Sequence, residues 1–188
     1  SRGLGDVYKR QVIISARIDG EINDKNGIGL FLVDNNQIKN RSYNTIDGYR
    51  AAELNFDSVK AELLCIDDQA LECIVKTNSA GALALSAEAV GIMQVCFDLT
   101  LDYLKTRKQF GKSIGAFQSI QHRMVDMMLE IEQVRSAVML ASSTFETESS
   151  IRDKNVSAAK NLVGRVGKLI AEESIQLHGG IAMTWEYS

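Results

Sequence analysis

Residues 101–128 read LDYLKTRKQFGKSIGAFQSIQHRMVDMM, and this stretch predicts two helices joined by a short turn. Its first part has the pattern of the end of an amphipathic helix. Gly111 and Gly115 interrupt that pattern, and a second helix is expected from about Ala116. In the second helix, apolar residues alternate spacings of four and three, which is typical of a helix with one buried stripe. The stripe consists of Ile120, Met124, Met127, Ile131, Val134 and Val138.

The turn between these helices combines cations with an aromatic ring and polar amides. Its residues are Arg107, Lys108, Gln109, Phe110, Lys112 and, slightly further on, Gln118. An arginine can direct two donors at the oxygens of a phosphate, which a lysine cannot. Such a turn therefore suits a ligand with a phosphate and a ring. A solvated basic turn has the same composition, so spacing alone leaves both interpretations open.

Composition excludes some classes of function. The chain has 188 residues, enough for one or two small domains, and its formal net charge of -3 gives no indication of nucleic-acid binding. No membrane-spanning helix is expected. Cys65, Cys73 and Cys96 lack the spacing of a metal or disulfide site, so we expect small packing residues. Sparse thiols fit a reducing compartment, either the cytoplasm or, in a eukaryote, the mitochondrial matrix.

The first part of the chain has the pattern of β-strands. Strands are expected at 12–18, at 29–33 and at 52–56, where Ala52, Leu54 and Phe56 alternate with polar residues and predict one buried face. Three strands alone make a poor core, so further strands are expected upstream. Residues 1–11 show no periodicity, and we expect a non-native leader there.

The second part has the pattern of long helices, beginning at about residue 67. Residues 79–107 can form one helix of roughly 40 Å, and a second helix is expected to reach about residue 146. A polar linker at 147–155 would end at Asn155, the expected N-cap of a third helix, which Gly179 and Gly180 would terminate. Val163, Val166 and Ile170 form the apolar stripe of that helix. Three antiparallel helices with short connections favour a bundle that lacks a fourth helix.

Three strings, in this order and spacing, resemble the acyl-CoA dehydrogenase family. They are DGYRAAE at 47–53 followed by Phe56-Asp57, TRKQFGK at 106–112 followed by Phe117-Gln118, and QLHGG at 176–180. The resemblance covers about residues 12–188 and corresponds to the later half of a family member. It implies an α+β fragment, in which 12–75 end the middle β-domain and 76–188 form an incomplete antiparallel helical bundle, the truncated C-terminal domain.

The resemblance also implies an FAD site. In the family, the arginine of the basic motif contacts the FAD pyrophosphate, the aromatic residue lies by the adenine end, and the glutamine reaches the cofactor. These roles fall on Arg107, Phe110 and Gln118. The family places the diglycine loop against FAD, so Gln176, Gly179 and Gly180 are expected to bind the cofactor too. His178 and His122 are expected to be structural, and no metal site is expected.

The activity implied by the resemblance is the oxidation of an acyl-CoA to the 2,3-enoyl-CoA, with electrons passed to an electron-transfer flavoprotein. Family members of this kind act in fatty acid metabolism, and most are tetramers. The catalytic glutamate usually follows the diglycine loop, beyond Ser188. In a minority it lies where this chain reads SAGA at 79–82, with no carboxylate; Glu88 is the only nearby acid. No catalytic residue is therefore assigned, and the chain alone is expected to be inactive.

Two other functions remain open on the same resemblance. An acyl-CoA oxidase or a flavin monooxygenase can share this scaffold. Alternatively, the strings LSAEAVG at 85–91 and LHGGIAMTWEYS at 177–188 resemble small subunits of paired acyl-CoA dehydrogenases. In that case the chain would be a non-catalytic helical subunit of a hetero-tetramer, completing a partner's site.

Overall fold

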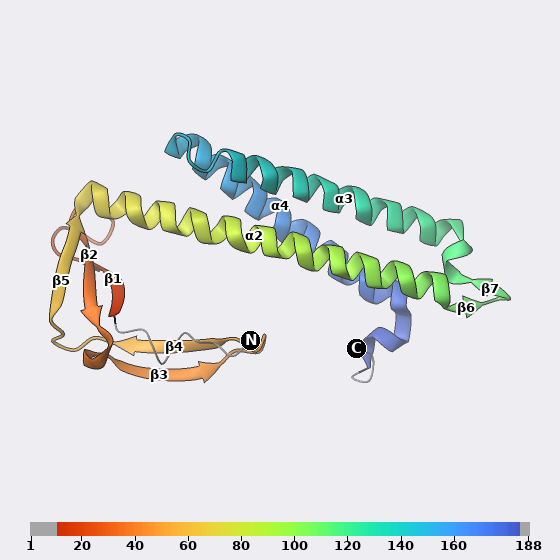
Figure 1. The fold of residues 1–188 in the computed structure, drawn as a ribbon, viewed down its shortest axis with the longest axis horizontal. Coiled ribbons are helices and arrows are strands. Elements are labelled where there is room, and N and C mark those ends of the chain that lie inside the picture. The colour runs from red at the N-terminus through yellow and green to blue at the C-terminus, as the bar shows by residue number, and fades with distance from the viewer. Residues whose placement is uncertain (1–10, 185–188) are drawn as a thin grey trace. The chain divides into compact units, whose positions relative to one another are not determined.

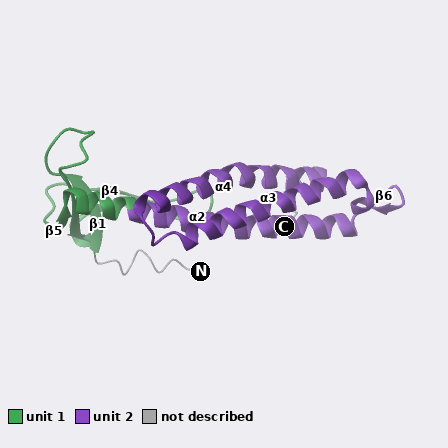
Figure 2. Cartoon of the chain, turned by 90° about the horizontal axis from the view of Figure 1, so that it is seen from above, with its two compact units in different colours: residues 1–75 green, residues 76–188 purple. Residues whose placement is uncertain are grey.

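The structure is a computed structural model that describes residues 11–184, and the chain divides into two compact units, Ser1–Val75 and Lys76–Ser188 (Figure 2). All of the expected leader except Gln11 lies outside the described residues. The last four residues of the C-terminal string also lie outside them. Each unit is described below by itself.

Over its described residues, 11–75, unit 1 contains five strands in two antiparallel sheets (Figure 1). Strands β1 (Gln11–Arg17), β2 (Ile28–Asp34) and β5 (Ala61–Ile66) form one sheet in the order β1-β2-β5, and the short 3-10 helix η1 (Asn35–Gln37) follows β2. Strands β3 (Lys39–Asn44) and β4 (Arg50–Asn55) pair as a hairpin. The strands expected at 12–18, 29–33 and 52–56 are thereby confirmed, the last with a start two residues earlier. Strands β3 and β5 were not predicted; β3, with the sequence KNRSYN, is polar on both faces.

The prediction that β4 has one buried face is wrong. Leu54 and Phe56 are 40% and 39% exposed, and Ala52 is exposed as well. The reason is that a two-stranded hairpin offers no second layer, and Ala52 and Leu54 instead border an open hollow of about 500 Å³. In the described part of unit 1, the buried hydrophobic side chains are Val33, Ile38 and Ala70. This small set agrees with the expectation of a poor core.

Helix α2 (Asp67–Thr106) is continuous over 40 residues, so the helix predicted from residue 79 begins twelve residues earlier. Asp67 and Asp68 lie in its first turn, where carboxylates interact favourably with the helix dipole. Gly81 and Gly91 do not interrupt it, because a helix tolerates isolated glycines at a modest cost. With a rise of about 1.5 Å per residue the helix is about 60 Å long.

By length and composition alone, α2 is also able to cross a membrane. An 18-residue window has a mean hydropathy of 1.6, and 17% of that window is buried. The sequence had predicted that no helix would be long and apolar enough to span a membrane. By length and composition, α2 does not support that prediction. A helix at the centre of a bundle has the same composition, so one such helix is weak evidence for a membrane protein.

Unit 2 folds as antiparallel helices that reverse at short connections (Figure 1). After α2, a small hairpin of β6 (Lys108–Gln109) and β7 (Lys112–Ser113) and the 3-10 helix η2 (Ile114–Ala116) lead into α3 (Gln118–Ser143). Helix α4 (Ser149–His178) then runs back and passes into η3 (Gly179–Met183). The predicted antiparallel arrangement is confirmed, and α3 begins two residues after the predicted start.

The linker predicted at 147–155 is wrong, because α4 already begins at Ser149. Asn155 lies inside this helix and is not an N-cap. Its side-chain amide donates to the hydroxyl oxygen of Thr144 at 2.9 Å, which joins α4 to the end of α3. The prediction failed because an asparagine in a polar stretch has the same local pattern whether its amide caps a helix or bonds across to another one.

A single hydrophobic core joins the three helices. The predicted stripes of α3 and α4 lie in it: Met124, Met127, Ile131, Val134 and Val138 are buried, as are Val163, Val166 and Ile170, and Ile120 packs against them partly buried. Helix α2 contributes Val90, Met93 and Leu104, but on another face its Leu85, Ile92, Val95 and Leu99 are each more than half exposed. The helix is therefore apolar on two faces, of which one is covered by α3 and α4.

Polar side chains fix the register of the bundle. Arg123 of α3 pairs with Glu173 of α4 at 2.6 Å, and hydrogen bonding to that carboxylate raises the pKa of the arginine. At the other end, the buried Arg152 and the hydroxyl of Ser79 both donate to Asp153, at 2.8 and 2.9 Å. These hydrogen bonds, that from Arg152 first, lower the pKa of Asp153.

The three cysteines are free thiols. Cys65 and Cys96 are partly buried, as expected of packing residues, but Cys73 is exposed, so the packing prediction is wrong for it. Burial raises the pKa of Cys65, and the neighbouring Cys73 raises it further.

Candidate functional site

The basic motif forms a tight hairpin that is fixed to the end of α2 through its backbone. Arg107 donates its N–H to the carbonyl of Tyr103 at 2.8 Å, and its own carbonyl accepts the N–H of Ile114 at 2.9 Å. Lys108 pairs with Ser113 and Gln109 with Lys112. The backbone at Arg107 is therefore held on both sides, and the guanidinium extends from a defined position.

Phe110 occupies an unusual position at the tip of this hairpin. Phe110 and Gly111 have φ angles of 54° and 80°, the combination that a two-residue type I′ turn requires. Glycine accepts such an angle readily, but a bulky residue is strained there. The ring is also 91% exposed, although its edge meets the ring of Phe117 with centroids 6.3 Å apart. Strain combined with exposure favours a ring that contacts a ligand.

The hairpin and the last turn of α2 concentrate positive charge. Lys105, Arg107, Lys108 and Lys112 are all exposed. The ammonium group of Lys112 lies 4.2 Å from the centre of the Phe117 ring, a cation–π contact. Within residues 11–184, neither Arg107 nor Lys108 forms an ion pair. Their charges are thus available to an anion.

The diglycine string forms the end of α4. Gly179 caps the helix with a φ of 69°, and its N–H bonds to the carbonyls of Gln176 and Ile175. Among the described residues, a Cβ atom built on Gly179 or Gly180 would have no neighbour within 4 Å beyond the adjoining residues, so packing there does not demand glycine at either position. The backbone of this loop is therefore open to close approach by a ligand. Gln176 is exposed one turn earlier.

Two aromatic rings meet where these strings come together. Tyr103 of α2 and His178 of α4 stack with centroids 4.5 Å apart and an interplanar angle of 26°. The ends of α2 and α4 therefore lie side by side, and Gln118, exposed in the first turn of α3, is at the same end of unit 2 (Figure 1). The structure thus gathers all six predicted site residues at one end of the helical unit.

The Tyr103–His178 pair was missed by sequence analysis, which assigned His178 only a structural role. The sequence offered one indication of this pair, because each ring lies within four residues of a predicted ligand contact. A sequence pattern does not show that two such residues, 75 positions apart, meet.

Next to the hairpin, α2 and α3 form an apolar groove of about 350 Å³, lined by Leu101, Leu104, Ile120 and Met124 among others. Glu88 lies away from this region, exposed on the uncovered face of α2. With no carboxylate at residues 79–82, the described helices present no candidate for the catalytic base at that position.

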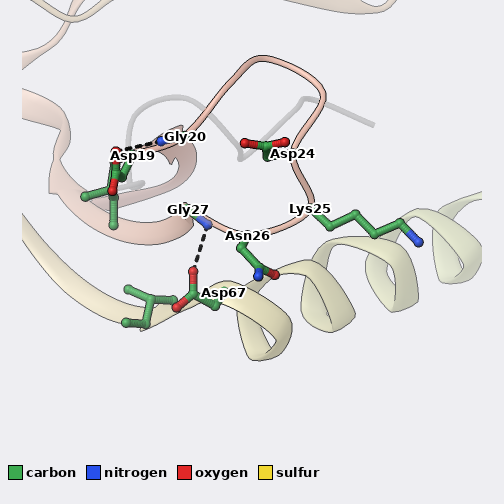
Figure 3. A pocket seen from close by; sticks show the side chains of 9 residues that line it. Asp19, Gly20, Asp24, Lys25, Asn26, Gly27 and Asp67 are labelled. Carbon is green, nitrogen blue, oxygen red and sulfur yellow. Dashed lines mark hydrogen bonds between the residues drawn. The ribbon is translucent and has the colours of Figure 1, made fainter.

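Unit 1 contains a larger recess, of about 660 Å³, beside the loop between β1 and β2 (Figure 3). Its carboxylates already have structural partners: Asp19 accepts the N–H of Gly20, Asp24 that of Glu21, and Asp67 that of Gly27, at 2.7 to 2.8 Å. In addition, the guanidinium of Arg17 donates to four backbone carbonyls of the loop. Among the described residues, no group of three or more histidines, cysteines or acids could hold a metal. These groups therefore build the loop.

Comparison with known sequences agrees with the family resemblance of the three strings. The family model described as "Acyl-CoA dehydrogenase, C-terminal domain" matches residues 71–188. The probable acyl-CoA dehydrogenase YngJ of Bacillus subtilis is 30% identical, over 96% of this chain and 49% of its own length. Acyl-CoA dehydrogenase IpdE2 of Mycolicibacterium smegmatis is 35% identical over 64% of this chain and 35% of its own length. The caffeyl-CoA reductase–Etf complex subunit CarC of Acetobacterium woodii is 32% identical over 60% of this chain and 30% of its own length.

Solved structures show the same fold. Butyryl-CoA dehydrogenase from Megasphaera elsdenii superposes with a TM-score of 0.85 at 24% identity, covering 95% of this chain and 48% of that one. A variant of the Tcur3481-Tcur3483 steroid ACAD superposes with a TM-score of 0.77 at 29% identity, covering 95% and 46%. The chain thus spans half or less of the length of the proteins that it matches. Since the family model covers well over half of this chain, the chain belongs to the acyl-CoA dehydrogenase family.

Proposed function

We propose that this chain is part of an FAD-dependent acyl-CoA dehydrogenase and binds the adenosine diphosphate half of FAD at the hairpin end of unit 2. Acyl-CoA dehydrogenases bind FAD. The observation that carries the proposal is the strained, exposed Phe110 beside Arg107, which forms no ion pair among the described residues. Both lie at the same end of the unit as the open diglycine backbone.

The described residues fit the parts of this ligand. The guanidinium of Arg107 can direct two donors at the pyrophosphate oxygens. The exposed ring of Phe110 offers an apolar face to adenine. Gly179 and Gly180 allow the backbone to come close, while the exposed amides of Gln118 and Gln176 can donate and accept at its edges.

In the whole protein, the reaction would oxidise an acyl-CoA thioester to the 2,3-enoyl-CoA, and bound FAD would supply the electron acceptor. A carboxylate outside the assigned residues would remove the proton next to the thioester carbonyl. The residues of this chain would hold and orient the cofactor without taking part in proton transfer. For this reason residues 1–188 alone should be inactive.

The partners proposed are an electron-transfer flavoprotein and further subunits of a tetramer, with an acyl-CoA as substrate. The name of the relative CarC, a subunit of a reductase–Etf complex, supports the first. The exposed apolar face of α2 supports the second, because such a face is usually covered by another element or chain. A cytoplasmic or mitochondrial-matrix location fits the three free thiols.

A second candidate is a non-catalytic subunit that completes the site of a related chain. It is favoured by the similarity to the Tcur3481-Tcur3483 steroid ACAD, whose name gives two components, while the absence of a carboxylate at 79–82 removes one of the two positions expected for the base. Co-purification with a second dehydrogenase-like chain would support this candidate. An oxidase or monooxygenase would instead consume oxygen without an added electron acceptor.

The cofactor proposal is tested by replacing Arg107 in the full-length protein. Arg107→Ala removes a charge-assisted hydrogen bond worth about 1.5–3 kcal/mol, so the Kd for FAD should rise between about tenfold and a hundredfold. Arg107→Lys should give an intermediate Kd, because it keeps the charge and loses the forked geometry. Lys105→Ala, which removes a neighbouring exposed cation, is the matched control. Titration of the apoprotein with FAD gives the Kd, and equal values for wild type and Arg107→Ala would refute the assignment.

A further inference from the structure

We propose that Tyr103 and His178 are positioning residues, whose stacked rings hold the diglycine loop in register with Arg107. This inference rests on the proposed function for its effect on flavin, while its structural part stands on the geometry alone. Neither ring is assigned a contact with the cofactor.

Each ring is anchored in its own helix next to a core residue. Leu104 follows Tyr103 and Leu177 precedes His178, and both leucines are buried. His178 is further fixed by a 2.8 Å hydrogen bond between its Nδ1 and the carbonyl of Ser174, one turn earlier. The two rings therefore meet from rigid backbones, with centroids 4.5 Å apart. Stacking between two anchored rings fixes the relative position of the helix ends that carry them.

Both rings are directly connected to the groups that would meet the ligand. The carbonyl of Tyr103 accepts the N–H of Arg107 at 2.8 Å, so the residue that stacks on α4 also holds the arginine backbone. On the other side, His178 is the last residue of α4 and Gly179 follows it at once. The Tyr103–His178 stack therefore joins the two halves of the proposed site, through a backbone hydrogen bond to Arg107 on one side and a peptide bond to Gly179 on the other.

The diglycine loop has little packing of its own. Within residues 11–184, no atom beyond the adjoining residues lies within 4 Å of a Cβ built on Gly179 or Gly180, and Gly179, Gly180 and Met183 are exposed. Glycine also has the widest choice of backbone conformations. A loop of this kind needs a neighbouring contact to fix it before it can present its amides to a ligand, and the stack at His178 supplies that contact.

The test compares ring-removing and ring-preserving variants of the full-length protein. Tyr103→Leu and His178→Leu remove the stack, while Tyr103→Phe and His178→Phe retain an aromatic ring. Phe145→Leu, at the opposite end of the same core, is the control for loss of an aromatic ring from the bundle. Two quantities are measured: amide hydrogen exchange of residues 179–184 in the apoprotein, and the Kd for FAD.

Both leucine variants should accelerate exchange in residues 179–184 and raise the Kd for FAD about tenfold, since small displacements of a binding group weaken its contacts. Tyr103→Phe and Phe145→Leu should leave both quantities near the wild-type values, and His178→Phe, which keeps a ring but loses the hydrogen bond to Ser174, should change them less than His178→Leu. Unchanged exchange in a folded Tyr103→Leu protein would overturn the proposal. If that variant does not fold, Tyr103→Phe and His178→Phe decide, because faster exchange in both would show that a ring pair alone does not hold the loop.

The two proposals can fail separately. Faster exchange in the leucine variants with an unchanged Kd for FAD would support the positioning of the loop and overturn its part in flavin binding. An effect of Arg107→Ala on FAD, with no effect of the leucine variants on exchange, would retain the cofactor proposal and refute the role of the stack.

Discussion

Phe110 shows how a single residue can oppose the local preference of its backbone. A type I′ turn favours Asn-Gly or Gly-Gly, yet this hairpin has Phe-Gly, with Phe110 at a φ of 54°. A strained backbone position of this kind costs on the order of 1–3 kcal/mol. The ring recovers little of that cost within the chain, since it is 91% exposed. The cost of the strained backbone is explained if the ring of Phe110 stabilises a bound ligand.

Phe110→Asn should separate stability from binding. Asparagine tolerates the left-handed region, so the substitution should raise the free energy of unfolding of the apoprotein by about 0.5–1 kcal/mol. At the same time it removes the exposed ring, and the affinity for FAD should fall. Chemical denaturation of the apoprotein and FAD titration measure the two effects. A less stable variant would show that the ring contributes to the fold.

At the scale of elements, the junction of α2 and α3 depends on one close backbone approach. A Cβ on Gly115 would lie 3.0 Å from the carbonyl oxygen of Leu104 and 3.3 Å from its carbonyl carbon. Backbone atoms in a helix cannot move aside as a side chain can. The glycine therefore allows η2 to pack directly on the last turns of α2, which sets where α3 begins its return.

Gly115→Ala and Gly164→Ala should have opposite effects on stability. The first forces η2 away from α2 and should lower the free energy of unfolding by about 1–3 kcal/mol, as overpacking does. Gly164 lies inside α4, where a Cβ has no neighbour within 4 Å among the described residues outside its own helix backbone, so alanine should raise the free energy of unfolding by about 0.5–1 kcal/mol. Thermal and urea unfolding of both variants measure the difference. Equal changes would contradict the close approach at Gly115.

For the whole molecule, the distribution of apolar surface matters more than any one contact. The exposed face of α2, from Leu85 to Leu99, and exposed strand residues such as Ile13 and Leu63 leave considerable apolar surface in contact with water. Soluble monomers rarely show contiguous patches of that kind. The chain should therefore associate when it is produced alone as residues 1–188.

Light scattering should show oligomers or aggregates of residues 1–188, and the double variant Ile92→Lys, Leu99→Lys should reduce their mass by placing charges on the exposed face of α2. Ser157→Lys with Ala171→Lys adds the same charge at exposed positions of α4 and should change the association less. A wild-type chain that remains monomeric and melts in one cooperative transition would contradict the prediction.

The sequence alone predicted features that depend on a repeated spacing or on a short motif. The four-three spacing of Met127, Ile131 and Val134 predicted the buried stripe of α3, because helical geometry alone places those residues on one face. The three family strings predicted the fold class and the family membership that the comparisons confirm. The assignment of Arg107 and Gly179 to the cofactor remains a prediction.

Only the tertiary structure decided the features that join residues distant in the chain. Whether Leu54 is buried depends on a second layer over the β3–β4 hairpin, which strand alternation does not reveal. Whether Asn155 caps a helix depends on Thr144, its partner across the bundle. The stack of Tyr103 on His178 exists because the core brings the ends of α2 and α4 together. Local pattern determines which face of an element is apolar, whereas packing determines what that face meets.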